Sequence, residues 1–395
     1  MTRSLAVSVA VGLVGMAAPA LAQSYLLVDL GTLGGQSEAF AVDALRHAVG
    51  SSTLPSAYFG AADYGGFLQF QPPTTVPAPA TYNENVAFCI GNGGAIYGAN
   101  YDLGSFFPVG FRSDSSGTTN LGTIIPRAVN GAGVIGGTTE INTNGLIVQR
   151  ACTHDGTALT QLPTLGGLAA NGLSLDGLGR IVGNSTTANE ASNRPCIWVG
   201  GVATDLGTLG GTNGQATDIK GGTIVGSSQN ASGVQRATRW VVNAAGQVQS
   251  RIDLGALSAN GSSFAKGVNS AGDAVGTSNF HAVLFRNGSV IDLNTLVRPH
   301  PDWTLEVAWA INDRGVIVGS GSKLGFRRAI MLVPCSADFN GDGDIGTDAD
   351  IEAFFACLAG NCCATCWSAD FNWDGDIGTD ADIESFFQVL AGGPC

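Results

Sequence analysis

The sequence predicts a mainly β protein, a closed seven-bladed β-propeller, followed by a small all-α module. Two observations predict the propeller. A glycine after β-branched residues recurs at intervals of roughly 40–50 residues, and short apolar runs between glycine-rich turns supply four strands per repeat. Because so small a unit cannot bury its apolar face alone, the repeats must pack on one another. The recurrent glycines are Gly50, Gly98, Gly136, Gly183, Gly226, Gly276 and Gly319.

Residues 1–22 are predicted to be a signal peptide. Arg3 provides the positive charge, residues 5–18 form the apolar segment, and Ala20-Leu21-Ala22 is a small-residue cleavage site. No later stretch has the ~18 consecutive apolar residues of a membrane span. We therefore expect an exported protein, extracellular or at the cell surface, whose cysteines are free to oxidise.

The repeat region is expected to cover residues 23–334 and to close into a ring. Its clearest stretch, residues 205–240, reads as four strands of one antiparallel sheet. The region ends on residues 328–333, which correspond to the third strand of a repeat, whereas residues 25–30 resemble a spare fourth strand. Pairing of these two segments would remove two open sheet edges. We therefore expect residues 25–30 to complete the seventh blade.

The net charge of −13 is concentrated at the C-terminal end of the chain. Residues 335–395 contain 12 Asp or Glu and no Lys or Arg, so the rest of the chain is nearly neutral. A nucleic-acid-binding protein would present a basic surface instead, and we expect no nucleic-acid partner. The acidic segment favours cation binding.

Two recurrent motifs have both a structural and a functional interpretation. Asp-Leu-Gly-Thr-Leu-Gly-Gly occurs at 29–35 and 205–211. We expect its Asp to bind the backbone of a tight turn, because phosphate binding would need a following helix. A cation recurs at the start of the third strand. It could attract anions to one face, but we favour bonds to an aspartate or to neighbouring backbone. These cations are Arg150, Arg194, Arg236, Arg328 and His281.

An aromatic-rich insertion interrupts the first repeat between Ser52 and Thr81, and five of the six tyrosines fall in this quarter of the chain. Loops on a rigid scaffold often carry binding sites. Aromatic rings also pack such insertions onto the sheet below, and we favour that interpretation. The tyrosines are Tyr58, Tyr64, Tyr82, Tyr97 and Tyr101.

Residues 335–395 contain two copies of a cation-binding pattern. Residues 338–345 read Asp-Phe-Asn-Gly-Asp-Gly-Asp-Ile, and residues 370–377 repeat this with Trp for the first Gly. Oxygen ligands at positions 1, 3 and 5, Gly at position 6 and a carbonyl at position 7 are typical of an EF-hand calcium loop. We expect two calcium sites. Their ligands would be Asp338, Asn340, Asp342, Asp344 and Asp350 in the first, and Asp370, Asn372, Asp374, Asp376 and Asp382 in the second.

The closing ligand departs from the EF-hand pattern. Position 12, normally acidic, is Ala349 or Ala381, and an aspartate follows one residue later. Asp350 and Asp382 could close a loop that is longer by one residue, or complete capping boxes with Thr347 and Thr379. Each loop should lead into a helix with one apolar face. The faces are Ile351, Phe354, Phe355 and Leu358, then Ile383, Phe386, Phe387 and Leu390.

Six of the nine cysteines lie in residues 335–395, which predicts a disulfide-stabilised module. The internal repeat favours pairing Cys335 with Cys363, Cys366 with Cys395 and Cys357 with Cys362. By contrast, Cys152 and Cys196 occupy the same strand position in successive blades. Their Cα atoms should lie beyond the ~7 Å that a disulfide can bridge.

The motifs above resemble those of two known families. The repeat region is similar to the HAF-type extracellular repeat family, with Asp-Leu-Gly-Thr-Leu-Gly-Gly and, at His281-Ala282-Val283, the nearest copy of a His-Ala-Phe-like strand. Residues 335–395 resemble a type I dockerin, particularly the Gly/Cys-rich variant. This resemblance implies an EF-hand-like calcium module that docks onto a cohesin-like receptor on a scaffold or the cell surface.

Two functions follow from these expectations. The favoured one is a non-catalytic exported binding protein, whose propeller presents a ligand site, such as one for carbohydrate, and whose calcium-dependent tail anchors it. The alternative is a polysaccharide-degrading enzyme, a glycoside hydrolase or lyase, delivered by its dockerin. A glycosidase usually needs two carboxylates that flank the sugar. The scattered acids of the repeats do not decide between the two functions, and no nucleophile–base set is evident.

Overall fold

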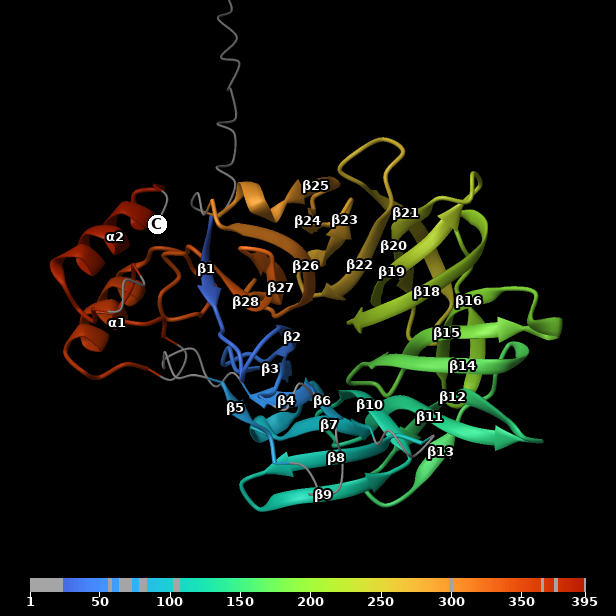
Figure 1. The fold of residues 1–395 in the computed structure, drawn as a ribbon. Helices are drawn as coiled ribbons and strands as arrows, with labels where there is room; N and C mark the ends of the chain where they lie inside the picture. The colour runs from blue at the N-terminus through green and yellow to red at the C-terminus, as the bar shows by residue number, and fades with distance from the viewer. Residues whose placement is uncertain are drawn as a thin grey trace, which may run out of the picture.

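The computed structural model of the protein describes residues 24–55, 59–63, 73–77, 84–101, 107–297, 301–363, 366–372 and 376–393. The predicted signal peptide lies outside these residues. Seven four-stranded antiparallel sheets surround a central axis (Figure 1), which confirms the predicted seven-bladed propeller. A small module with two helices, here called the tail (residues 335–393), lies beside the propeller.

The strands of each blade follow one another outward from the central axis. Blade 1 contains β2 (Ser37–Val42), β3 (Ala48–Thr53), β4 (Phe59–Asp63) and β5 (Thr74–Thr75). Blade 2 contains β6 (Glu84–Ile90), β7 (Ile96–Tyr101), β8 (Val109–Asp114) and β9 (Gly117–Gly122). Blade 3 contains β10 (Ile124–Val129), β11 (Ile135–Thr143), β12 (Leu146–His154) and β13 (Leu159–Gln161).

The next three blades repeat this order. Blade 4 contains β14 (Gly166–Leu175), β15 (Ile181–Thr187), β16 (Asn193–Val199) and β17 (Val202–Asp205). Blade 5 contains β18 (Gly210–Lys220), β19 (Thr223–Asn230), β20 (Gln235–Val242) and β21 (Val248–Gly255). Blade 6 contains β22 (Ser263–Val268), β23 (Ala274–Ser278), β24 (His281–Arg286) and β25 (Ser289–Asp292).

Blade 7 joins the two ends of the repeat region, as expected. It contains β26 (Trp303–Ile311), β27 (Ile317–Lys323), β28 (Phe326–Pro334) and, outermost, β1 (Tyr25–Asp29). β1 pairs antiparallel with β28 from Tyr25 opposite Pro334 to Asp29 opposite Ile330. The backbone N–H of Leu30 then donates to the carbonyl of Ala329 at 3.0 Å. The ring is therefore closed by hydrogen bonds between its first and last strands.

The expectation that residues 205–240 form one sheet is wrong. Asp205 ends β17 of blade 4, residues 206–209 cross to the next blade, and only β18, β19 and most of β20 belong to blade 5. The apolar residues Leu206 and Leu209 of the motif resemble a strand, but they lie in the connection between blades. The fourth strand of blade 5, β21, follows later in the chain.

Every inner strand contains a β-bulge, a position where one extra residue interrupts the pairing with the second strand. The bulge recurs at the same place in all seven blades. The bulged residues are Phe40, Phe88, Arg127, Leu173, Thr217, Lys266 and Trp309.

The recurrent glycine of the sequence lies opposite this bulge. Gly226, for example, pairs with Ala216, and a Cβ atom on Gly226 would clash with the carbonyl oxygen of Gln215. The same clash occurs at the equivalent glycine of each blade. In blade 3 this position belongs to Gly137 and not to Gly136, because Gly137 faces Pro126 beside the bulge.

The apolar core is divided between neighbouring blades. Trp198 and Trp240, at equivalent positions in β16 and β20, are fully buried and each packs against the preceding blade. Their indole N–H groups donate to the carbonyls of Pro163 (2.7 Å) and Gly207 (3.0 Å), in the connections between blades. These bonds satisfy the polar end of each buried indole.

The tail contains α1 (Asp348–Leu358) and α2 (Asp380–Leu390). At eleven residues each, the α-helices of the described chain are too short and too polar to span a membrane. Both helices follow the predicted acidic loops, and their buried phenylalanines join a core that extends into blades 7 and 1.

Candidate functional site

The first acidic loop of the tail brings three of the predicted ligands together. Carboxylate oxygens of Asp338, Asp342 and Asp350 lie within 4.8 Å of one another. A calcium ion with bonds of about 2.3–2.6 Å accommodates ligand oxygens at such separations. Two other predicted ligands lie outside this cluster of three carboxylates and contact Asp342. Asn340 donates through its amide to Asp342 at 2.8 Å, and Asp344 contributes its backbone N–H to Asp342.

Asp350 has the capping role that the sequence left open, and it also lies in the carboxylate cluster. It completes a capping box at the start of α1, where its carboxylate accepts the backbone N–H of Thr347 at 2.8 Å. Its other oxygen accepts the N–H of Asn340 at 3.2 Å. Asp350 is fully buried and at the same time belongs to the three-carboxylate cluster. The additional loop residue therefore does not move the last acid away from the others.

Asp338 provides an observation that fits a cation. Its Oδ1 atom is buried and has no hydrogen-bond partner. Burial raises the pKa of Asp338, and the nearby Asp350 and Asp342 carboxylates raise it further. A buried acceptor without a donor, beside two like charges, is costly unless a cation neutralises it. The first loop therefore fits calcium by its donor set and by its unsatisfied oxygen.

The second loop repeats part of this arrangement. Asp382 is fully buried, caps α2 through Thr379 at 2.8 Å, and accepts the backbone N–H groups of Phe371 (2.7 Å) and Asn372 (3.2 Å). The buried Asp370 and the exposed Asp376 lie in the same loop. Asp374, the remaining predicted ligand, lies outside the described residues.

The helix faces differ from the predicted pattern. Phe354 and Phe386 are fully buried and stack with ring centroids 4.2 Å apart, together with Phe339 from the first loop. Phe355 and Phe387 are 44% and 40% exposed instead, with ring centroids 6.3 Å apart. A helix turns by 100° per residue, and here the core takes one phenylalanine of each pair while the next one lies at its edge, partly exposed.

The tail disulfides are only partly as expected. Cys357 pairs with Cys362, which was predicted. Cys363 pairs with Cys366, so the predicted pairs of Cys335 with Cys363 and of Cys366 with Cys395 are both wrong. The two cysteines are close in sequence, and their Cα atoms are 5.0 Å apart, within the range of a disulfide. Cys152 and Cys196 are not joined to each other, as predicted, and both are buried.

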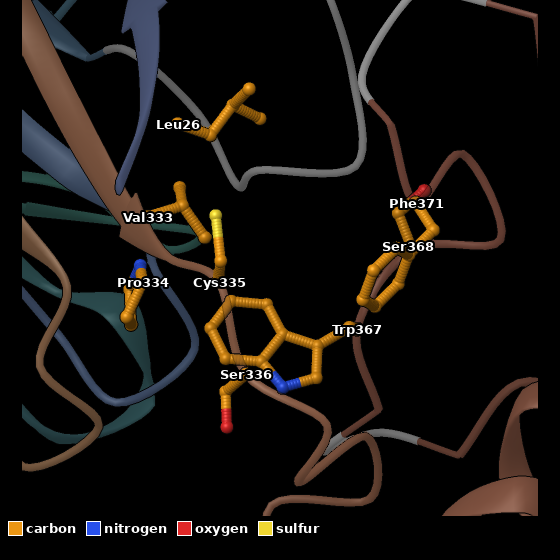
Figure 2. A pocket seen from close by; sticks show the side chains of 8 residues that line it. All are labelled: Leu26, Val333, Pro334, Cys335, Ser336, Trp367, Ser368 and Phe371. Atoms are coloured by element: carbon orange, nitrogen blue, oxygen red, sulfur yellow. The ribbon is translucent and has the colours of Figure 1, made fainter. Parts of the chain in front are cut away.

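The tail is packed against the propeller. Trp367 lies beside Leu26 and Val333 of the outer strands of blade 7 (Figure 2). The space between them is about 10 Å³, too small for a ligand. Arg46, in the first turn of blade 1, is buried and donates to the carbonyl of Cys366 at 2.8 Å, with its guanidinium 4.8 Å from the Trp367 ring.

The second candidate site is the central cavity of the propeller, with a volume of about 320 Å³. The bulged residues of all seven inner strands line it, and it extends toward the face that carries the exposed Lys220. Sequence reasoning missed this site. The lining position can be located in the sequence, because the bulged residue directly follows the residue that pairs with the recurrent glycine. The residue type at this position differs between blades, so no repeated motif marks it.

Cationic and aromatic side chains are neighbours in this cavity. The guanidinium of Arg127 lies 4.2 Å from the ring centroid of Phe88, and the ammonium of Lys266 lies 4.9 Å from that of Trp309. Phe40 bridges the two groups, with centroids 6.2 Å from Phe88 and 5.6 Å from Trp309. Cation–π contacts of this kind stabilise a cation without neutralising its charge.

Asp218 is the only carboxylate among the described residues that line the cavity. One oxygen accepts the Ser174 hydroxyl at 2.7 Å, and the other accepts the backbone N–H of Val268 at 2.9 Å. Burial raises the pKa of Asp218, against the opposing effect of these hydrogen bonds. Both oxygens thus connect blade 5 to its neighbours.

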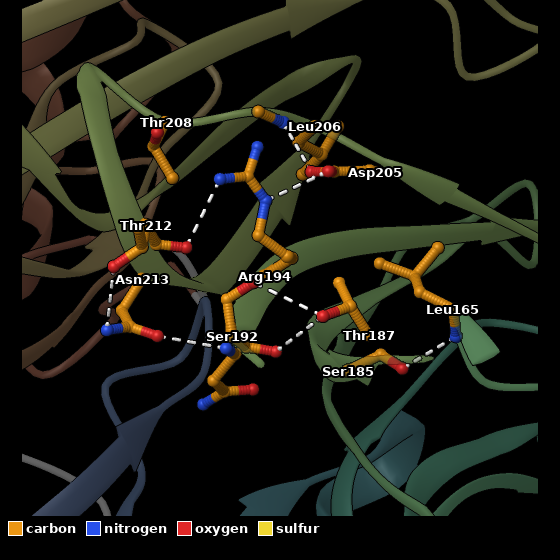
Figure 3. A network of polar contacts seen from close by, with 12 residues as sticks. Leu165, Ser185, Thr187, Ser192, Arg194, Asp205, Leu206, Thr208, Thr212 and Asn213 are labelled. Carbon is orange, nitrogen blue, oxygen red and sulfur yellow. Dashed lines mark hydrogen bonds and ion pairs between the residues drawn. The ribbon is translucent and has the colours of Figure 1, made fainter. Parts of the chain in front are cut away.

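Three of the five recurrent cations pair with an aspartate, which is the structural role that the sequence favoured. Arg194 contacts Asp205 at 2.9 Å and donates to the carbonyl of Thr212 at 3.2 Å (Figure 3). Arg236 with Asp253 and His281 with Asp292 repeat the pair. Among the described residues, no carboxylate partner is found for Arg150 or Arg328.

The Asp-Leu-Gly-Thr-Leu-Gly-Gly motif is a connection between blades. The N–H of Gly207 donates to Asp205 at 2.7 Å, and the N–H of Leu209 donates to the hydroxyl of Ser228 at 3.2 Å. The first of these bonds confirms the predicted turn. The predicted insertion between Ser52 and Thr81 is partly wrong, because Phe59–Asp63 and Thr74–Thr75 are β4 and β5, the third and fourth strands of blade 1. Tyr58, Tyr64 and Tyr82 lie outside the described residues, and Tyr97 is buried.

No protein-family model matches the chain, and no curated protein matches it. Among solved structures, TolB from Acinetobacter baumannii is 13% identical with a TM-score of 0.37, covering 76% of this chain and 64% of that chain. A puromycin hydrolase mutant complexed with PGG is 15% identical with a TM-score of 0.49, covering 74% and 51%. A Trypanosoma rangeli sialidase is 10% identical with a TM-score of 0.36, covering 76% and 54%. This chain thus spans less than two thirds of each, and its assignment as a propeller rests on its own strand pairing.

Proposed function

We propose that the protein is an exported, non-catalytic binding protein, in which the propeller holds a ligand and the tail anchors the molecule in a calcium-dependent manner. One observation carries the choice of binding over catalysis. The single carboxylate that lines the described cavity, Asp218, has both oxygens engaged in bonds between blades. Glycoside hydrolysis usually requires two carboxylates free to act on the sugar.

The tail supports the anchoring role in two ways. The first loop has a carboxylate cluster and an unsatisfied oxygen that suit calcium. In addition, large apolar side chains are exposed at equivalent positions of the two repeats. Ile345 and Ile377 are 72% and 73% exposed, and Phe355 and Phe387 are also partly exposed. Duplicated exposed apolar residues are typical of a surface that binds another protein, and a cohesin-like receptor is the proposed partner.

The full-length protein can be tested on plant and algal glycans. We expect retention on at least one glycan without release of reducing sugar. Attachment to the cells that make the protein should be lost when calcium is chelated, or when Phe355 and Phe387 are both changed to serine. Absence of glycan retention, together with attachment that neither treatment alters, would contradict the proposal.

A second candidate, glycoside hydrolase, is favoured by one group of residues. Glu38 and Glu306, on the inner strands of blades 1 and 7, both contact Arg327, at 2.6 and 3.9 Å. Glu38 also accepts the indole N–H of Trp309 at 3.2 Å. Release of reducing sugar that disappears in Glu38→Gln and in Glu306→Gln would establish this function in place of binding.

A further inference from the structure

We infer that the central cavity binds a small organic carboxylate, with Arg127 and Lys266 pairing with its charge and Phe40, Phe88 and Trp309 contacting its apolar face. This inference rests on the proposed binding function and specifies its ligand class. Uronic acid sugars and aromatic acids both combine a carboxylate with a flat apolar face, and the experiment below distinguishes these two sources.

The bulges explain why these side chains face the cavity. A bulge rotates one side chain out of the regular alternation of a strand. Arg127 and Lys266 are the extra residues of their strands, and both are lining residues of the cavity. A strand without the bulge would direct alternate side chains between the blades. The fold therefore presents one chosen residue per blade to a shared central space.

The charge of the cavity is opposite to that of the protein. Among the described residues, its lining includes Arg127, Lys220 and Lys266, against the single acid Asp218. The whole chain has a net charge of −13. Lys220 pairs with Asp313 at 3.2 Å at the exposed rim. Among the described residues, Arg127 and Lys266 have no carboxylate partner. An anion entering the cavity would meet two cations that are not neutralised by the protein.

Burial makes these cations costly until an anion is bound. The pKa values of Arg127 and Lys266 are both lowered by burial. The Nε atom of Arg127 is buried without a hydrogen-bond acceptor. A carboxylate paired with the guanidinium would offset this cost, because hydrogen bonds between ionised groups are stronger than neutral ones. A neutral ligand would leave both cations unpaired.

The aromatic residues set the shape of the ligand. Phe40 contacts both Phe88 and Trp309, so the three rings form one apolar surface between the two cations. Because Trp and Phe rings bind flat apolar faces, including those of sugars, this surface favours a ring-shaped ligand. The volume of about 320 Å³ is at the lower end for small-molecule sites and limits the ligand to one or two rings.

Calorimetry on the full-length protein tests the inference. The probes are digalacturonate and its neutral methyl ester, and 4-hydroxybenzoate and its neutral amide. We expect at least one acid to bind at least about tenfold more tightly than its neutral counterpart, with an affinity that falls as salt is raised. The acid that binds identifies the source, sugar or aromatic.

Variants locate the binding. Arg127→Met and Lys266→Met should each weaken binding of that acid by about tenfold. Lys323→Met is the matched control, because Lys323 also lies over a tryptophan, 5.3 Å from the Trp303 ring, but is not a lining residue of the cavity. Its affinity should be unchanged. The salt dependence of the wild-type protein keeps the test valid if a variant fails to fold.

Three results would overturn the inference: equal affinity for acid and neutral probes, binding that is insensitive to salt, or no binding of either acid. If neutral glycans are retained while neither acid binds, the inference fails and the proposed binding function stands. If reducing sugar is released in a manner that depends on Glu38, the proposed function itself fails.

Discussion

A single atom explains the most regular feature of the sequence. Glycine recurs in the second strand of each blade because the carbonyl oxygen of the bulged strand occupies the place of a Cβ atom. Although extended strands usually disfavour glycine, the clash outweighs that preference here. The bulge in the first strand therefore requires the glycine in the second strand.

Replacing this glycine should destabilise the propeller. Gly226→Ala forces a Cβ atom against the carbonyl of Gln215, and we expect a loss of about 3 kcal/mol in the free energy of unfolding. Gly177→Ala is the control, because a Cβ at Gly177 meets no atom within 4 Å. Denaturant titration of both variants checks this. Equal stability of the two would contradict the steric explanation.

His47 gives blade 1 a dependence on pH. Its hydrogen bond to Asp63, at 2.6 Å, is the main cause that raises the pKa of His47 above 6.5. The protonated form is therefore stabilised in the folded state. This contribution is complete below pH 6.5 and is lost as the pH rises through the raised pKa of His47.

Comparison with His47→Gln makes this measurable. The wild-type protein should exceed the variant in stability by about 1 kcal/mol at acidic pH, and this difference should shrink toward pH 9. Thermal unfolding of both proteins across this range checks the sign. A difference that grows with pH would mean that the neutral imidazole is the stabilised form.

At the scale of elements, the connections between blades are held by a repeated polar network. An aspartate at the end of the outer strand binds the turn that follows it, and pairs with a cation of the third strand. The same cation reaches the carbonyls at the start of the next blade. Each network thus fixes the angle between two neighbouring sheets.

Arg194 and Arg150 allow this role to be measured. Arg194→Met removes the contact with Asp205 and the bonds to the next blade, so we expect a loss of about 1 kcal/mol. Arg150→Met should change stability by less than about 0.5 kcal/mol, since within the described part of the chain Arg150 bonds to the adjacent carbonyl of Gln149 alone. Urea titration compares them. A larger effect for Arg150 would contradict the assignment.

The acidic loops should make the tail dependent on calcium. At about a hundredfold excess over the Kd of one site, calcium should stabilise the tail by about 3 kcal/mol. Asp342→Asn should weaken calcium binding, whereas Glu352→Gln, with the same charge change on the exposed face of α1, should not. Calorimetry and melting curves with and without chelator check both. Identical melting in calcium and chelator would contradict the calcium sites.

The features that could be predicted from the sequence are those that recur in every repeat. The period of the glycines and the missing fourth strand were enough to predict seven blades and their closure. The blade boundary at Asp205 was misplaced, because Leu206 and Leu209 are apolar although they lie in a connection. The cavity could not be predicted, because Phe40, Arg127, Lys266 and Trp309 share a backbone position but no residue type.

At the scale of the whole molecule, the tail and the propeller share one core. Trp367, Phe339 and Phe371 of the tail belong to the same apolar cluster as Val333 of blade 7 and Ala48 of blade 1. Tethered modules usually have separate cores and move independently. Here the buried Arg46 and Trp367 connect the two. Removal of calcium from the proposed sites should therefore lower the stability of the propeller as well.

Trp367→Ala tests this connection. Removal of a buried tryptophan should cost about 3–5 kcal/mol, and both parts of the molecule should melt at lower temperature. Ile345→Ala, at an exposed position of the same tail, should leave the melting temperature unchanged. Calorimetric scans of the full chain check this. A propeller transition that is unaffected by Trp367→Ala would show that the two parts unfold independently.

The pairing of β1 with β28 also has a consequence in time. β1 is synthesised first, but its partner follows about 300 residues later, which at 5–20 residues per second is a delay of roughly 15–60 s. During that interval β1 is an unpaired strand, and the growing ring has an open edge at each end. A second copy whose β28 has been made but is not yet paired offers the same edge, so exchange between copies competes with closure. When new chains are started more often, the concentration of chains that have not yet closed increases. The yield of correctly closed rings should therefore fall.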